Sequence, residues 1–392
     1  MLKRCFAVVV LGFTAACSVE EPPTPAANEV RDSAGVQILI AAAPSFDTVH
    51  LATSLEIGGE GDPDYEFFRV QQISPLASGN IVVTNGGTHE LLFYDAVGSF
   101  IRRVGRRGEG PGEFGFLSTV YPWAGDSLIT SDPRNRRISV FDSAGVFGRD
   151  ANFSTALTDV APETTCAFPG LNGVLGDGAW FTRGWGCMEF NGADGPKDAT
   201  VTMEIVHEER NDTIGTFTSN RVWEHGDADP GPGMWSMIRF DAVMRTATTS
   251  DHVYLSLGTS HDVFVYDGSG ALVTILRERA ELDPVSNADI EAYRAARLAE
   301  GDTVDADQPF AEHFAGYDRL IISHEGELWA KWTERPTEEG RRWTVWSADR
   351  TERRNYLLPD LDIRAMRGGK LYALTRDDLG LQQVVVLDWP AS

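Results

Sequence analysis

One sequence pattern recurs along this chain of 392 residues. Each copy has a glycine or aspartate turn, a β-rich run, a polar turn and a second β-rich run. Val, Ile, Leu and aromatic residues fill the runs, whereas Gly, Asp and Asn separate them, as expected of short strands joined by turns. The pairs of runs are 79–84 with 91–98, 126–130 with 138–145, 178–182 with 201–206, 251–255 with 263–270, 326–330 with 343–347, and 369–374 with 384–388.

Six copies of one β-rich unit strongly constrain the fold. Each copy supplies two central strands of a sheet, and the connecting segments supply the outer strands. Four short antiparallel strands, repeated around an axis, form a β-propeller. The regular spacing argues against one long sandwich, and the scarcity of helical periodicity argues against an α/β sheet. The sequence therefore predicts an all-β fold, a six-bladed β-propeller of four-stranded antiparallel blades, over residues 34–392.

A glycine-rich string from Gly105 to Phe114 follows the first repeat, with the sequence Gly-Arg-Arg-Gly-Glu-Gly-Pro-Gly-Glu-Phe. With the preceding turn it resembles the NHL-type repeat, and more closely the bacterial six-bladed, TolB-like propeller lipoproteins. This resemblance implies a ring closed by the N-terminal strand, here residues 48–57, pairing beside residues 384–387 of the last blade. It implies a scaffold and no single activity.

The first 16 residues are typical of a secretory signal peptide. A basic start (Lys3, Arg4) precedes the apolar run 6–13, which is too short to span a bilayer. The small residues before Cys17 resemble a lipoprotein lipobox, which implies cleavage before Cys17 and attachment of lipid to it. Ser18 after the cysteine favours the outer membrane. Residues 17–33, rich in Pro, Glu and Ala at their start, are expected to be a flexible tether.

Charge excludes one class of partner. The formal net charge is −24, whereas proteins that bind nucleic acid present a basic face to phosphate. We therefore expect the membrane, through the lipid anchor, and an envelope protein, peptide or glycan as partners, and no nucleic acid.

Two cysteines remain in the propeller, Cys166 and Cys187. In an oxidising envelope compartment, two such cysteines are expected to form a disulfide. The glycine-rich stretch between them is typical of hairpin turns, which would bring the two together. Two buried free thiols are the alternative.

An insert over residues 286–314 is expected to contain a short amphipathic helix. Ser286 fits an N-cap, with Asp289 three residues on, and Gly301 fits a stop signal. The apolar residues Ile290, Tyr293 and Leu298 fall on one face of this helix. The helix either covers a hydrophobic patch or closes one mouth of the central channel.

A second insert, residues 219–237, concentrates carboxylates, an imidazole and two tryptophans among Pro and Gly. Its acids could hold a divalent cation such as calcium, although the full pattern of a calcium loop is absent. A solvated acidic loop is the alternative, and the tryptophans either stack on a sugar ring or anchor the loop. The candidate metal ligands are Glu224, His225, Asp227 and Asp229, and the candidate binding aromatics are Trp223 and Trp235.

Four arginines are candidate binding residues. Arg106 and Arg107 lie in the glycine string, whose backbone N–H groups could cradle an anion, and Arg134 and Arg136 lie in the matching turn of the second repeat. The alternative is that the glycines serve tight turns and that the arginines are solvated.

The chain contains no metalloprotease, nucleophile-elbow or phosphate-loop motif. Our first hypothesis is a non-enzymatic binding or interaction module, because a rigid scaffold with variable loops suits recognition. The second is a metal-dependent hydrolase or lyase, lactonase-like, with acidic or imidazole ligands from several blades meeting in the central channel. The third is a structural role in a larger envelope complex.

Overall fold

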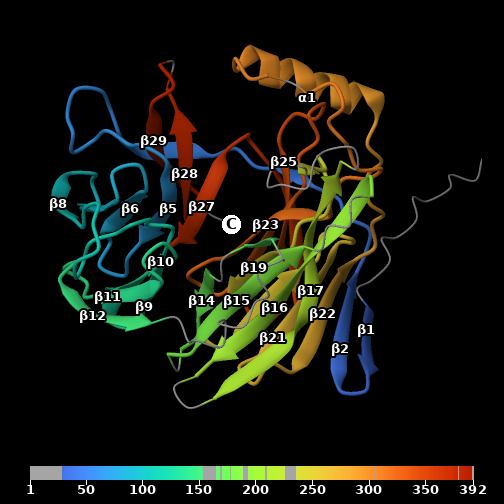
Figure 1. The fold of residues 1–392 in the computed structure, drawn as a ribbon, viewed down its shortest axis with the longest axis horizontal. Coiled ribbons are helices and arrows are strands. Elements are labelled where there is room, and N and C mark those ends of the chain that lie inside the picture. The colour runs from blue at the N-terminus through green and yellow to red at the C-terminus, as the bar shows by residue number, and fades with distance from the viewer. Residues whose placement is uncertain are drawn as a thin grey trace, which may run out of the picture.

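The computed structural model describes residues 29–152, 165–167, 170–176, 178–188, 193–207, 210–225, 235–303, 305–377 and 379–390. Within these residues the strands form six sheets that follow one another along the chain. Figure 1 shows the sheets arranged around the centre of the molecule. The protein is thus an all-β, six-bladed β-propeller, as the repeat predicts.

Each blade runs from an inner strand at the axis to an outer strand at the rim. Blade 1 contains β5 (Val70–Pro75), β6 (Ile81–Asn85), β7 (Glu90–Tyr94) and β8 (Phe100–Val104), and blade 2 contains β9 (Thr119–Trp123), β10 (Ser127–Asp132), β11 (Arg137–Phe141) and β12 (Phe147–Asn152). Blade 3 contains β13 (Thr165–Ala167), β14 (Gly170–Val174), β15 (Trp180–Met188), β16 (Gly195–Val206), β17 (Asn211–Glu224) and β18 (Trp235–Met237).

Blades 4 to 6 follow the same order. Blade 4 contains β19 (Arg245–Thr248), β20 (His252–Ser256), β21 (Asp262–Asp267) and β22 (Leu272–Glu278). Blade 5 contains β23 (Tyr317–Ile322), β24 (Leu328–Trp332), β25 (Arg341–Trp346) and β26 (Arg353–Leu358), and blade 6 contains β27 (Asp362–Arg367), β28 (Lys370–Arg376) and β29 (Gln382–Asp388). Every pair of runs in the sequence repeat is an antiparallel pair of central strands.

The N-terminal segment adds strands to the rims of three consecutive blades. The hairpin of β1 (Glu29–Ser33) and β2 (Val36–Ala41) joins blade 4, where β2 runs parallel to β22. The short β3 (Asp47–Thr48) runs parallel to β26 of blade 5. Blades 4 and 5 therefore exceed the expected four antiparallel strands. Because β1 falls inside the expected tether of residues 17–33, the folded part begins earlier than the sequence indicates.

The next strand, β4 (Ala52–Ile57), closes the ring. It pairs antiparallel with β29, from Ile57 opposite Val384 to Ala52 opposite Asp388. This confirms the closure expected for residues 48–57. The last blade is therefore built from both ends of the described chain, which joins blade 6 to blade 1.

The hydrophobic core lies between the blades. In the described residues, one buried cluster occupies each interface between neighbouring blades. The cluster between blades 6 and 1, for example, contains Ile57, Ile73 and Val384. The inner strands β5, β9, β14, β19, β23 and β27 contact one another in sequence around the ring, so their inward edges define a central channel.

The predicted helix is present as α1 (Asn287–Ala299). Ser286 caps it, and a capping box links Ser286 with Asp289. Tyr293 packs edge-on against Phe240 and Phe310, so the helix covers an aromatic patch, and none of its residues lines the channel cavities described below. The expectation for Leu298 is wrong, because this residue is 61% exposed.

The second insert also starts later than expected. Residues 219–224 belong to β17, which pairs with β16 and, at its end, with β18. In the described part of the chain, no helix is long and apolar enough to cross a membrane.

Candidate functional site

A cavity of about 940 Å³ occupies one mouth of the central channel. Every blade contributes to it from the C-terminal part of its inner strand, because these strands run in the same direction along the axis. Six representative lining residues, one from each blade, are Gln72, Tyr121, Asn172, Thr246, Ile321 and Arg364.

Hydrogen-bond donors are left over around this cavity. Ser74 of β5 is 1% exposed, yet its Oγ has no partner among the described residues, and neither has Nε1 of Trp123 in β9. The Oε1 atom of Gln72 accepts from the backbone N–H of Val120 at 3.3 Å, which leaves its NH₂ group as a donor. Unpaired buried polar atoms cost free energy. The Ser74 and Trp123 atoms have almost no accessible surface, so they lie behind the surface of the cavity and not on it.

Blade 6 supplies the basic wall of the cavity. Arg364 is fixed by its bonds to the carbonyl of Gln71 at 2.8 Å and to Asp362 at 2.5 Å, while its Nε has no partner in the described chain. Arg367 donates to Nδ1 of His324 at 2.9 Å. Both guanidinium groups are therefore positioned by blades 1, 5 and 6 before any ligand arrives.

The one acid in this lining, Asp126, is already satisfied. Its carboxylate follows the short 3-10 turn Ala124–Asp126 and accepts the backbone N–H groups of Ala77 at 2.6 Å and Ser78 at 2.9 Å. Burial alone would raise the pKa of Asp126, but these hydrogen bonds and the nearby Arg367 hold it below its usual value. The mouth therefore has a cation, Arg367, without an acidic partner among the described residues, and an acid that is already satisfied, which suits an anionic ligand.

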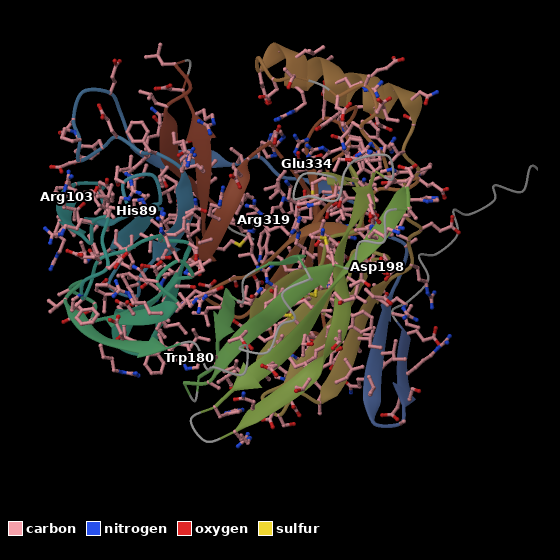
Figure 2. All side chains as sticks on the ribbon, viewed as in Figure 1. His89, Arg103, Trp180, Asp198, Arg319 and Glu334 are labelled. Carbon is pink, nitrogen blue, oxygen red and sulfur yellow. The ribbon has the colours of Figure 1, made fainter. Side chains whose placement is uncertain are left out.

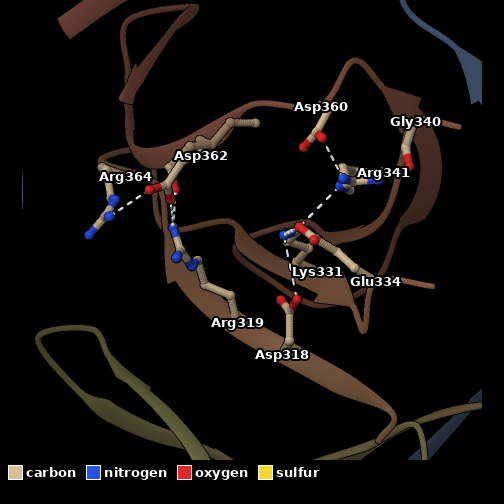
Figure 3. A network of polar contacts seen from close by, with 10 residues as sticks. Asp318, Arg319, Lys331, Glu334, Gly340, Arg341, Asp360, Asp362 and Arg364 are labelled. Carbon is tan, nitrogen blue, oxygen red and sulfur yellow. Dashed lines mark hydrogen bonds and ion pairs between the residues drawn. The ribbon is translucent and has the colours of Figure 1, made fainter. Parts of the chain in front are cut away.

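The opposite mouth has a different character. A cavity of about 320 Å³ lies there, at the N-terminal ends of β19, β23 and β27. Figure 3 shows its ionic network, in which Asp362 binds both Arg319 and Arg364, and Arg341 bridges Glu334 and Asp360. Lys331 completes the network by pairing with Asp318 at 3.4 Å and with Glu334.

Charge in this network is balanced internally. Burial raises the pKa of Asp318, whereas at Asp362 the two arginines outweigh burial and lower the pKa. The cations thus have acidic partners before any ligand binds. Arg245 of β19 differs because it forms no ion pair with the described residues, and burial lowers its pKa. We take the first mouth as the candidate site, because its cavity is the larger of the two and its Arg367 has no acidic partner among the described residues.

The described residues do not form the metal site that the enzyme hypothesis requires. Among them, no three His, Cys, Asp or Glu side chains gather where they could hold a metal ion. The acids that line the channel are bound to arginines, a lysine or backbone N–H groups.

The glycine string does form an anion cradle, but the chain fills it. Glu113 accepts the backbone N–H of Gly110 at 2.9 Å and Nε of Arg106 at 2.7 Å. The Gly110 N–H, followed by Arg106, lowers the pKa of Glu113. The buried Arg137 donates to the carbonyls of Glu109, Gly110 and Glu113 and so holds the string in place.

The other candidate arginines stay at the rim of blades 1 and 2. Arg107 forms an isolated backbone bridge with Phe114, and Arg134 and Arg136 are exposed in the turn between β10 and β11. Neither they nor Arg106 lines the cavities at the two mouths. Figure 2 shows the contrast, with Arg319 near the centre of the ring and Arg103 at its outer edge.

The acidic insert is only partly described. Glu224 is buried and pairs with Lys197 at 3.1 Å, and His225 Nε2 lies 3.0 Å from the hydroxyl of Ser236. Trp223 donates to Asp194 at 3.1 Å, and Trp235 is 37% exposed on β18. Asp227 and Asp229 lie outside the described residues, so a metal site there stays a prediction.

The cysteine predictions are tested only through the backbone. Cys166 on β13 lies directly opposite Cys187 on β15 in the antiparallel register. This register is compatible with a disulfide, which itself stays a prediction. Cys17 lies outside the described residues.

Sequence reasoning missed Arg364 and Arg367 because it began each repeat at the second strand of the blade. The inner strand lies immediately upstream, and in the last repeat it reads Asp-Ile-Arg-Ala-Met-Arg from Asp362 to Arg367. If each repeat is started one strand earlier, these two arginines fall on the inner strand and are predicted to lie near the axis.

Comparison with known proteins agrees with the fold. The DUF5128 family, described as a 6-bladed beta-propeller, matches residues 60–150. No curated protein matches the chain.

Solved structures of low sequence identity share most of the chain length. A Bacteroides fragilis protein described as exported is 12% identical, covers 87% of this chain and 96% of its own, and has a TM-score of 0.48. Virginiamycin B lyase from Staphylococcus aureus is 9% identical, covers 87% of this chain and 100% of its own, and has a TM-score of 0.42. The calcium-binding protein regucalcin from Agrobacterium tumefaciens is 11% identical, covers 86% and 96%, and has a TM-score of 0.38. We carry none of their activities over to this chain.

Proposed function

We propose that this protein is an exported, lipid-anchored β-propeller that binds an anionic ligand in the first mouth of its channel. The observation that supports this most directly is Arg367, which lines that mouth and has no acidic partner among the described residues, whereas Arg364 beside it is paired with Asp362. It belongs to a protein whose net charge is −24, so a cation of this kind at the mouth is a local exception.

The chemistry narrows the ligand expected from the sequence. Among the peptides, proteins and glycans considered there, those with an exposed carboxylate, phosphate or sulfate match the arginines best, because guanidinium groups recognise such oxyanions by paired, charge-assisted hydrogen bonds. A cavity of about 940 Å³ admits a ligand of small-molecule size or the end of a longer chain.

Binding titrations test this function. The probes are N-acetylglycine, glucuronate and inorganic phosphate, with N-acetylglycinamide and glucose as neutral counterparts. We expect at least one anion to bind, its neutral counterpart to bind much more weakly, and added salt to weaken the binding. The Arg367→Met variant should bind about 10-fold or more weakly, since a hydrogen bond to a charged group contributes about 1.5–3 kcal/mol.

Arg134→Met is the matched control, because Arg134 is exposed at the rim and does not line the channel. Equal binding of charged and neutral probes, or equal losses in the two variants, would show that the mouth is not an anion site. Lipid anchoring has its own test: metabolic labelling with palmitate should mark the wild-type protein and not the Cys17→Ala variant.

A further inference from the structure

A second cavity, of about 230 Å³, lies between blades 5 and 6 beside the channel mouth. Its apolar wall is an aromatic cluster of Trp329, Tyr356 and Trp389. The ring of Trp389 stands edge-on to Trp329 at 5.1 Å and to Tyr356 at 4.9 Å between ring centroids. We call this cavity the blade 5/6 cleft. It is large enough for one head group or side chain, and smaller than the usual site of a complete ligand.

The cleft also contains carboxylates that lack a cation. Glu327 accepts Nε1–H of Trp329 at 3.1 Å, and Glu325 accepts the backbone N–H of Gly368 at 2.7 Å. Among the described residues neither forms an ion pair, although both line the cleft.

Two of the three bases in the same lining have acidic partners. Arg354 pairs with Glu352 at 3.2 Å, and Lys370 pairs with Asp388 at 2.5 Å. The third base, Arg367, forms no ion pair among the described residues and offsets one of the two glutamates, so one negative charge remains next to the aromatic rings. Aromatic rings and carboxylates together attract ammonium groups, by cation–π and Coulomb interaction.

We propose that the blade 5/6 cleft binds an ammonium group, and that the protein's ligand is a zwitterion, with its anion at the channel mouth and its cation in this cleft. Arg367 lines both cavities, which places the anion site and the cation site next to each other. The anionic half of this inference rests on the proposed function, whereas the cationic half rests on the cleft alone. A lysine residue with a free carboxylate has this chemistry.

A neutral sugar is the main competing occupant, because sugars also stack on aromatic rings. It would not neutralise the two glutamates, although its hydroxyl groups could donate hydrogen bonds to them. Probes with and without an ammonium group separate the two occupants, and Glu327→Gln removes the charge while it keeps an acceptor for Trp329.

The experiment is a titration of the full mature chain with three related probes. Nα-acetyl-lysine carries a carboxylate and an ammonium group, N-acetylnorleucine carries the carboxylate alone, and Nα-acetyl-lysine amide carries the ammonium group alone. We expect Nα-acetyl-lysine to bind about tenfold more tightly than N-acetylnorleucine, the preference that a cation–π contact and a carboxylate provide. Glu327→Gln should abolish this preference and leave the affinity for N-acetylnorleucine unchanged. Glu291→Gln, an exposed change on α1, should preserve both.

The outcomes separate the two proposals. If N-acetylnorleucine binds as tightly as Nα-acetyl-lysine, the cleft does not bind ammonium, and the anion site stands. If only the probes with an ammonium group bind, with or without a carboxylate, the cleft stands and the anion site is wrong. If no probe binds at millimolar concentration, the zwitterion proposal is wrong. It is also wrong if glucose binds and Glu327→Gln weakens the binding of all probes equally.

Discussion

His261 shows how one buried residue can tie stability to pH. It is 3% exposed, and its ring packs on Trp332 with the centroids 3.9 Å apart. Burial, with a smaller contribution from Arg342, lowers the pKa of His261 from 6.5 to about 4. The unfolded chain therefore takes up a proton near pH 6.5 and the folded chain only near pH 4. The stabilisation that neutral His261 contributes is complete above pH 6.5. It is lost as the pH falls from 6.5 to about 4, by about 3 kcal/mol at most.

Urea unfolding of the wild type and His261→Phe at about pH 7.5 and about pH 5 measures this loss. Phenylalanine keeps an aromatic ring against Trp332 and cannot titrate, so the variant should gain stability relative to wild type at the lower pH. Glu278 lies nearby, and burial raises its pKa to about 7, which gives a slope of opposite sign. That slope is common to both proteins and cancels in the comparison. If the free energies of unfolding of the wild type and His261→Phe differ by the same amount at both pH values, the prediction is wrong.

At the residue scale, the sequence predicts interactions between neighbours in the chain well. It predicts hydrogen-bond partners that are distant in the chain poorly. The capping box of Ser286 and Asp289 depends on residues three apart, and it is present as expected. The role of Arg137, whose three acceptors lie 24 to 28 positions away, depends on which strands the fold brings together. For the same reason the sequence analysis names the exposed Arg134 and Arg136 as candidates and not the buried Arg137 beside them.

At the scale of the element, β13 and β15 support a disulfide. Cys166 lies opposite Cys187 in the antiparallel register. Residues directly opposite each other have Cα atoms about 4.5–5.5 Å apart, inside the range of about 4.4–6.8 Å that a disulfide requires. We expect protein from an oxidising compartment to have no free thiol at these two positions, and Cys166→Ser to lower the free energy of unfolding by about 2–3 kcal/mol.

Peptide mapping without reduction checks this bond, and the matched comparison is Cys166→Ser with and without Cys187→Ser. The single variant and the double variant should be equally destabilised, because the disulfide is already lost in the single variant. Two thiols that react in the folded, unreduced protein would refute it.

The elements themselves were predictable to different degrees. The central strands carry alternating or continuous apolar runs, because both faces of a blade are buried against its neighbours, and all six pairs appear where the repeat puts them. The edge strands β1 and β3 carry mostly exposed residues, which leave no periodic signal. The parallel pairing of β2 with β22 and of β3 with β26 depends on the path of the chain, which the sequence pattern does not contain.

The whole molecule depends on where the ring closes. Removing β1 to β3 strips the rims of blades 4 and 5 but leaves the closure of blade 6 intact, whereas removing β4 as well opens the ring. At the rim, β2 contributes Ile40 and Ala41 to the core, and Arg353 binds both the carbonyl of Ala42 at 3.0 Å and Glu278 at 2.9 Å. Loss of these contacts should cost several kcal/mol, since one buried aliphatic side chain contributes about 1.5–3 kcal/mol.

Two truncated chains separate these effects. A chain that begins at Val49 keeps β4, so we expect it to fold and to unfold cooperatively, with a lower melting temperature than the complete chain. A chain that begins at Gly58 lacks β4, which exposes the row of Val384 to Val386 and leaves blade 6 unpaired, so we expect no cooperative transition. Moving residues 49–57 to the C-terminus behind a flexible linker should restore it, because β4 would again reach β29. If the chain from Gly58 melts like the chain from Val49, β4 is dispensable and the ring is held by the contacts between blades alone.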